Sequence, residues 1–167
     1  MRIVFFETTK EDAEYIASTL SDHTVTCLSE PLNAETASKA TDAEIVSVFI
    51  NSKVDKAVLD ALPNIKLITT RSTGYDHIDT AYAASRGISV ASVPSYGSRT
   101  VAEFTFGLIL TVVRKIFDAY HQLREGSDFN IERLRGMELY GKTLGIVGTG
   151  RIGKHLARLA QGIGMRT

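Results

Sequence analysis

Short runs of apolar, mostly β-branched residues recur along the first 92 positions, separated by more polar stretches. In each run successive residues are apolar, rather than every second one, which is typical of a strand covered on both faces. The five runs are residues 3–6, 25–28, 45–50, 67–70 and 88–91. We therefore expect five short parallel strands.

Between these runs lie segments whose apolar residues recur at helical spacing. They cover residues 11–20, 54–62 and 78–85, with a weaker case at 34–40. Strands that alternate with helices are typical of the α/β class. We therefore expect residues 1–98 to form a doubly wound parallel sheet of flavodoxin-like type.

A longer helical segment follows Pro94. Thr100 and Glu103 have the spacing of a capping box, so we expect a helix to begin near Thr100, run to about Glu125 and stop at Gly126. Positions 104–113 are apolar on nearly every side of this helix, which predicts burial between layers or domains. A polar connector, residues 127–140, comes next.

The pattern G-x-G-x-x-G occurs once, at residues 148–153, between an expected strand at 143–147 and an expected helix at 152–163. In this context Gly148 permits a tight turn, Gly150 lets backbone approach a pyrophosphate, and Gly153 lets the helix pack on the strand. Amides of Arg151 and Ile152 would face the anion. A glycine-rich turn that binds nothing is the alternative. The acidic residue that distinguishes NAD from NADP would fall beyond residue 167, which leaves that choice open.

A second candidate site is the loop at residues 71–79, which follows the fourth expected strand at its carboxyl end, where open α/β sheets place ligands. Gly74 permits an unusual backbone angle, and successive amides of such a turn can hold a carboxylate. Asp76 and Asp79 could instead cap the next helix, and the two interpretations are compatible. Tyr96 follows the fifth expected strand and could hydrogen-bond a substrate or lie half-buried at a domain junction.

Composition narrows the class of protein. The 167 residues carry 19 Lys and Arg against 19 Asp and Glu, without runs of like charge, so a nucleic-acid partner is not expected. The single cysteine, Cys27, excludes an internal disulfide and favours a reducing compartment, with the cytoplasm as the default. The longest apolar run, residues 104–113, is half a membrane span. We expect no membrane segment and no metal site.

Four motifs in order, at residues 71–79, 93–97, 100–103 and 148–153, resemble the D-isomer-specific 2-hydroxyacid dehydrogenases, and D-lactate dehydrogenases most closely. The resemblance covers the whole chain. It implies a flavodoxin-like substrate domain at 1–98, an interdomain helix at 99–126 and the start of an NAD-binding Rossmann domain at 127–167.

The resemblance also implies roles for single residues. The reaction would be hydride transfer between NADH and a 2-keto acid such as pyruvate. The substrate-binding positions would be Thr73, Gly74, Tyr75 and Tyr96, with the backbone of the first two holding the carboxylate. Val101 would pack on the nicotinamide, and the cofactor-binding turn would comprise Gly148, Gly150, Arg151, Ile152 and Gly153.

The family's catalytic arginine, glutamate and histidine have no counterpart in these 167 residues, and we transfer no such role to Arg71, Arg99 or His77. We therefore expect an N-terminal portion of a longer dehydrogenase that is inactive alone. The alternative is a stand-alone binding or self-association module, for which a homodimer is the expected assembly. A flavin carrier or phosphoacceptor of the same fold is less favoured, because the first strand ends in Phe5-Phe6-Glu7 without a phosphate loop or an acidic pair.

Overall fold

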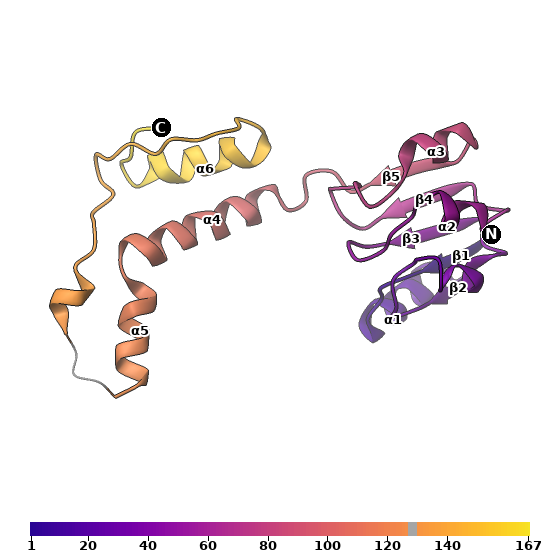
Figure 1. Ribbon diagram of the computed structural model, residues 1–167, viewed down its shortest axis with the longest axis horizontal. Helices are drawn as coiled ribbons and strands as arrows, with labels where there is room; N and C mark the ends of the chain where they lie inside the picture. Colours follow the sequence, from indigo (N-terminus) through magenta and orange to yellow (C-terminus); the bar gives the residue numbers. More distant parts are fainter. Residues whose placement is uncertain (127–129) are drawn as a thin grey trace. The chain divides into compact units, whose positions relative to one another are not determined.

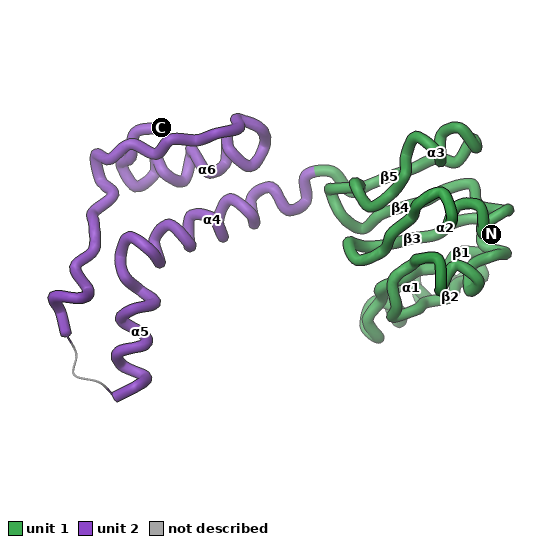
Figure 2. Tube along the Cα trace, viewed as in Figure 1, with its two compact units in different colours: residues 1–94 green, residues 95–167 purple. Residues whose placement is uncertain are grey.

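The computed structural model describes residues 1–126 and 130–167. The chain divides into two compact units, residues 1–94 and residues 95–167 (Figure 2). Within the described residues, no helix is long and apolar enough to cross a membrane.

Unit 1 is built on one parallel sheet of five strands (Figure 1). The strands are β1 Arg2–Phe5, β2 Thr24–Cys27, β3 Ile45–Val48, β4 Leu67–Thr70 and β5 Ser89–Ser92. Their order across the sheet is β2-β1-β3-β4-β5, and every neighbouring pair is parallel. This is the order of flavodoxin-like sheets, which confirms the expected fold class.

Three helices of unit 1 begin at side-chain caps. They are α1 Lys10–Thr19, α2 Lys56–Asp60 and α3 Thr80–Ser85, with Thr9, Asp55 and Asp79 as the respective N-caps. Thr9 and Asp12 form a complete capping box. The second and third helices begin two residues later than expected, because Val54 and Ile78 pair with each other in an isolated β-bridge.

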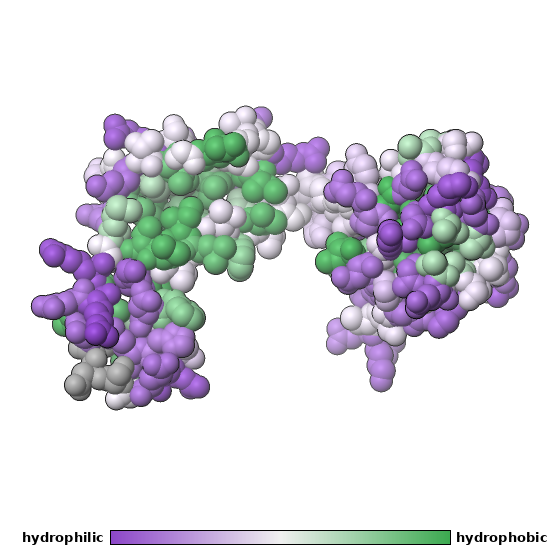
Figure 3. Space-filling view, viewed as in Figure 1, coloured by the Kyte–Doolittle hydropathy of each residue, from purple (hydrophilic) through white to green (hydrophobic). Residues whose placement is uncertain are grey.

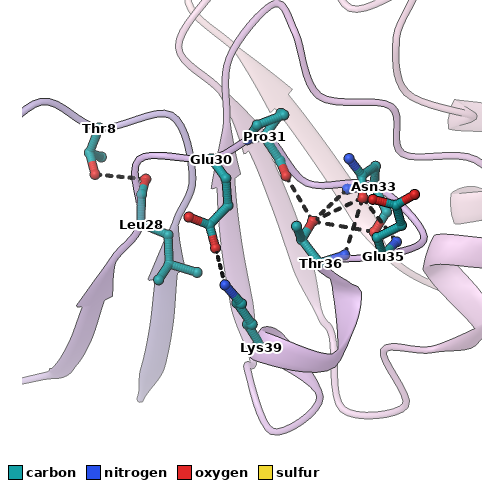
Figure 4. A network of polar contacts seen from close by, with 8 residues as sticks. All are labelled: Thr8, Leu28, Glu30, Pro31, Asn33, Glu35, Thr36 and Lys39. Carbon is teal, nitrogen blue, oxygen red and sulfur yellow. Dashed lines mark hydrogen bonds and ion pairs between the residues drawn. The ribbon is translucent and has the colours of Figure 1, made fainter.

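The weaker helical segment at 34–40 is only a 3-10 turn, η1 Ala37–Ala40. A local hydrogen-bond network competes with a regular helix here (Figure 4). Asn33 Oδ1 accepts from the amides of Glu35 and Thr36, and Thr36 Oγ1 donates to Pro31 O at 2.7 Å. Figure 4 also shows Lys39 paired with Glu30.

The core of unit 1 is continuous beneath its helices. The three inner strands contribute Val4, Val46 and Ile68, each at most 1% exposed, and α2 contributes Leu59. The two outer strands alternate between exposed and half-buried positions. The expected cover on both faces is therefore wrong for β2 and β5, because each lies at an edge of the sheet. The central strands therefore fix the register, and the sheet's carboxyl edge presents the loops that follow β1, β3 and β4.

Unit 2 contains helices but no paired strand among its described residues. The elements are α4 Ser98–Val113, α5 Ile116–Arg124, the 3-10 turn η2 Ile131–Leu134 and α6 Arg151–Gly162. Helix α4 packs on α6, with Phe106, Leu139, Ala160 and Met165 buried between them.

Several expectations for unit 2 are wrong. The long helix is broken after Val113, because Lys115 takes the left-handed conformation (φ 58°). Thr100 lies inside α4, whose N-cap is Gly97 without a side-chain hydrogen bond, so the expected capping box is absent. Gly126 does end the helical segment, with φ 64°. Of the expected connector, residues 127–129 lie outside the described residues.

Burial of residues 104–113 on all sides is also wrong. Phe106 is buried, but Phe104 is 68% and Val112 is 70% exposed, and Figure 3 shows apolar residues gathered over α4. The expected strand at 143–147 is not formed, since only Thr143 pairs, in an isolated bridge with Arg166. Only one face of α4 finds a partner in unit 2.

Candidate functional site

The loop after β4 is held in place by its own side chains. Ser72 is buried, its hydroxyl donates to Gly74 O at 2.7 Å, and it shares a 2.6 Å hydrogen bond with Thr70 Oγ1. Thr73 Oγ1 donates to Val93 O at 3.0 Å, and the Val93 amide donates to Ser72 O at 3.1 Å. These bonds tie the loop to the segment after β5, so its backbone is pre-organised.

Three expected substrate-binding residues lie on this loop. Thr73, Gly74 and Tyr75 are all exposed. Within the described part of the chain, the amides of Thr73 and Gly74 find no hydrogen-bond acceptor. Two adjacent unpaired amides on a loop held in this way can donate hydrogen bonds to a carboxylate.

The expected unusual backbone angle at Gly74 is wrong, since it is not among the residues with positive φ. A Cβ built there would meet only Asp76 Oδ2, at 3.8 Å. The position that a Cβ would occupy at Gly74 is therefore open apart from this one contact.

The other polar residues of the loop have structural roles. Asp79 Oδ1 accepts from the Tyr82 amide at 2.9 Å and caps α3, as one of the two sequence interpretations requires, while Asp76 makes no cap. His77 Nε2 lies 3.2 Å from Thr70 Oγ1, and His77 O accepts from the Val54 amide. His77 thus anchors the loop.

A cavity of about 510 Å³ opens at the same carboxyl edge of unit 1, lined by residues that follow β1, β2, β3 and β4 and by Asp12 of α1. Glu7 is its organising side chain. Its carboxylate accepts from the amides of Phe49, Asn51 and Ser52 and from Ser52 Oγ at 2.5 Å. Burial raises the pKa of Glu7, but the hydrogen bonds from Ser52, Asn51 and Phe49 outweigh it and lower the pKa below its usual value. Glu7 also adopts a left-handed backbone (φ 55°).

Arg71 also lines this cavity, and its guanidinium makes three hydrogen bonds to the ends of neighbouring strands. It donates to Phe6 O at 2.7 Å, Glu7 O at 2.8 Å and Ser47 Oγ at 3.1 Å. Burial lowers the pKa of Arg71, and the charge of Glu7 partly offsets this. Arg71 therefore joins the ends of β1, β3 and β4, which agrees with assigning it no catalytic role.

The glycine turn of unit 2 is constrained at two of its three glycines. Gly148 has φ 95°, and a Cβ on Gly153 would lie 2.1 Å from Gly148 O, so both positions need glycine. A Cβ on Gly150 would meet nothing within 4 Å, which leaves the approach open. Gly150 is the N-cap of α6, and the first-turn amides of Arg151 and Ile152 have no acceptor within the described ranges. These residues fit a pyrophosphate.

The remaining expected site residues belong to unit 2. Tyr96 is 62% exposed and lines a cavity of about 500 Å³ together with Arg151. Val101 is 46% exposed on α4 and does not line that cavity. Thr73, Gly74 and Tyr75 thus share one loop of unit 1, whereas Tyr96, Val101 and the glycine turn lie in unit 2.

Sequence reasoning missed Glu7 and Ser72. Glu7 is named from the sequence only because the end of the first strand lacks a phosphate loop and an acidic pair. The available signal is its position directly after a central strand, which marks the carboxyl edge of the sheet. Ser72 gave no signal, because its hydroxyl acts on backbone groups of its own loop.

The sequence and the fold of this chain are similar to those of known proteins. Residues 3–159 match the family described as D-isomer specific 2-hydroxyacid dehydrogenase, catalytic domain. The chain is 39% identical to 2-hydroxyacid dehydrogenase A of Aspergillus oryzae and 38% identical to D-lactate dehydrogenase kk1H of Curvularia clavata, over 99% of this chain and 50% of each relative.

A crystal structure of D-lactate dehydrogenase from Aquifex aeolicus, complexed with NAD and lactic acid, is 32% identical with a TM-score of 0.90. The match covers 98% of this chain and 49% of that one. The chain therefore spans about half the length of the relatives that it matches. It belongs to the D-isomer specific 2-hydroxyacid dehydrogenase family.

Proposed function

We propose that these 167 residues hold the substrate carboxylate and begin the dinucleotide site of an NAD-dependent D-2-hydroxyacid dehydrogenase that reduces a 2-keto acid such as pyruvate. The observation that carries the proposal is the glycine turn, where Gly148 and Gly153 cannot be replaced without strain while Gly150 stays open. When bound, NADH supplies the hydride. The first-turn amides of α6 bind its pyrophosphate, and Val101 offers an apolar surface to the nicotinamide.

The substrate side of the proposal rests on the loop after β4. A 2-keto acid presents a carboxylate, and the unpaired amides of Thr73 and Gly74 donate to it from a backbone fixed by Ser72. Tyr75, on the same loop, contacts the remainder of the substrate, and Tyr96 is a substrate-binding position by family resemblance. Because binding here uses backbone groups, it orients the acid without selecting its side chain.

Turnover requires a group to polarise the keto oxygen and an acid to protonate it. By resemblance to the family, an arginine polarises the keto oxygen and a histidine paired with a glutamate is the acid. These three residues have no counterparts in this chain. General acid catalysis alone contributes about 10²–10⁴-fold to such reactions. We therefore propose that the 167-residue chain binds its ligands but does not turn over by itself.

The first test measures NADH oxidation at 340 nm by the purified chain with pyruvate, beside a full-length D-lactate dehydrogenase. We expect no rate above background from the chain. A rate near the enzyme median of about 10 s⁻¹ would overturn the claim that it is catalytically incomplete.

The second test isolates the substrate loop through binding of oxamate, an unreactive analogue of pyruvate. Gly74→Val fills the space before the two amides, so we expect oxamate affinity to fall at least about tenfold, the effect of losing charge-assisted hydrogen bonds. Gly145→Val is the matched control, because a Cβ there meets nothing within 4 Å and the residue lies outside the loop. Equal affinity in both variants would remove the carboxylate assignment.

A second candidate function is a non-catalytic self-association module. Exposed apolar side chains on α4 and α5 favour it, notably Val112 and Leu123 at 70% and Phe117 at 60%. Sedimentation velocity should then show a homodimer that Leu123→Glu dissociates. A monomer at high concentration would leave only the dehydrogenase proposal.

A further inference from the structure

The cavity that Tyr96 and Arg151 share has an unusual charge. It measures about 500 Å³ and is lined by Ser95, Tyr96, Ser98, Arg99, Arg151, Lys154, His155 and Arg158. Four of these side chains are cationic at neutral pH, and none is acidic. A pocket of this size suits a small molecule.

Three of the cations stand on one face of α6. Arg151, Lys154 and Arg158 lie three and four positions apart, with His155 between them, so like charges neighbour one another along the helix. The first turn of α6 contains no acidic residue, although the positive end of the helix dipole favours one. Both features destabilise the free chain, and a bound anion would relieve both.

Nothing in the described part of the chain neutralises this face. Arg99, Arg151, Lys154 and Arg158 form no ion pair there. In unit 1, by contrast, Lys66 pairs with Glu44 at 2.8 Å and Lys56 pairs with Asp60 at 2.7 Å. The cations that line this cavity therefore stand together without a counter-charge from the described residues.

We propose that this cavity binds a small molecule carrying at least two phosphoryl groups, at a site separate from the glycine turn. Phosphoryl oxygens match the guanidinium groups of Arg99 and Arg158 and the ammonium of Lys154. Of the turn at 148–153, only Arg151 lines the cavity, and the other cations of α6 lie one and two turns further along the helix. The proposal does not depend on the dehydrogenase function.

The test is calorimetric titration of the 167-residue chain with sodium tripolyphosphate at neutral pH and low ionic strength, where screening is weak. We expect one tight site per chain at the cavity, distinct from any weaker binding at the glycine turn. The double variant Lys154→Gln, Arg158→Gln should weaken binding at least about tenfold, since two charge-assisted contacts are lost. Because both side chains are exposed and repel their neighbours, the variant should fold with an unchanged or raised Tm.

Two controls separate the alternatives. Arg133→Gln removes one positive charge from η2, outside the cavity, and should change the affinity less than about twofold, the range of a screened surface charge. Gly150→Val blocks the glycine turn without altering charge, and should also leave tripolyphosphate binding intact. The proposal is overturned by an absence of binding, by an equal loss in Arg133→Gln, or by a tenfold loss in Gly150→Val, which would place the anion on the turn.

Discussion

The two units use the same kind of β-branched run with opposite outcomes. In unit 1, β4 pairs with β3 on one side and β5 on the other, and Ile68 is fully buried. In unit 2, the run at 143–147 forms one bridge, and Val147, directly before the glycine turn, is fully exposed. A strand therefore requires partners that accept its hydrogen bonds, whereas a turn encoded by glycine forms from local geometry alone.

The candidate sites differ in the same way. The substrate loop of unit 1 is tied to the segment after β5 by Thr73, whose hydroxyl donates to Val93 O. In the neighbouring cavity, Glu7 joins the end of β1 to the loop after β3 by accepting from the Phe49 amide. The turn of unit 2 depends on the close contact between Gly153 and Gly148. Substitutions should therefore act through tertiary contacts in unit 1 and through the backbone in unit 2.

The largest expected effect tests the core of unit 1. Ile68→Ala should lower the free energy of unfolding by about 2–5 kcal/mol, because it opens a cavity in a fully buried site. Val112→Ala, on the exposed face of α4, should stay within about 0.5 kcal/mol. Urea unfolding followed by circular dichroism measures both, and similar values would remove the contrast between the units.

The next effect tests the glycine turn. Gly153→Ala would put a Cβ 2.1 Å from Gly148 O, so the backbone of the turn must shift. We expect a loss of about 1–3 kcal/mol, as for other overpacked sites. Amide hydrogen exchange in α6 should accelerate while exchange in β3 stays unchanged, and protected α6 amides in the variant would refute the close packing.

A smaller effect concerns Glu7. Glu7→Gln should destabilise unit 1 by about 1–2 kcal/mol at neutral pH, since four donors lose a charged acceptor that is partly screened by solvent. Its folded-state pKa is lowered, so the stabilisation is present above the unfolded value of 4.5 and is lost as pH falls through the folded pKa. Unfolding of both proteins between neutral pH and pH 3 should show the curves converging on the acid side.

The smallest expected effect is an increase, rather than a decrease, in the free energy of unfolding. Gly107 lies inside α4, without positive φ, and a Cβ there meets nothing within 4 Å. Gly107→Ala should therefore stabilise unit 2 by roughly 0.5–1 kcal/mol. Slower hydrogen exchange in α4 would confirm it, and a loss of protection would show that Gly107 has a packing role.

Most elements of the fold could be predicted from local sequence patterns. The apolar runs located all five strands of unit 1 to within two residues, because each run pairs with at least one neighbouring strand. Asp79 was recognised as a cap because capping involves residues three apart. Thr100 matched the same pattern but lies inside α4, since the helix begins earlier at Ser98. Nothing in the sequence signals the break at Lys115, a residue without intrinsic preference for left-handed backbone.

The sequence by itself determined the sheet, the glycine turn and the candidate residues on both loops, because spacing and residue type encode those features locally. Tertiary structure alone decided that Ser72 would lock the substrate loop, that Glu7 and Arg71 would join three strand ends, and that cations of α4 and α6 would line one cavity. Those groups are far apart in the chain or act on backbone atoms, so their relation exists only once the chain has folded.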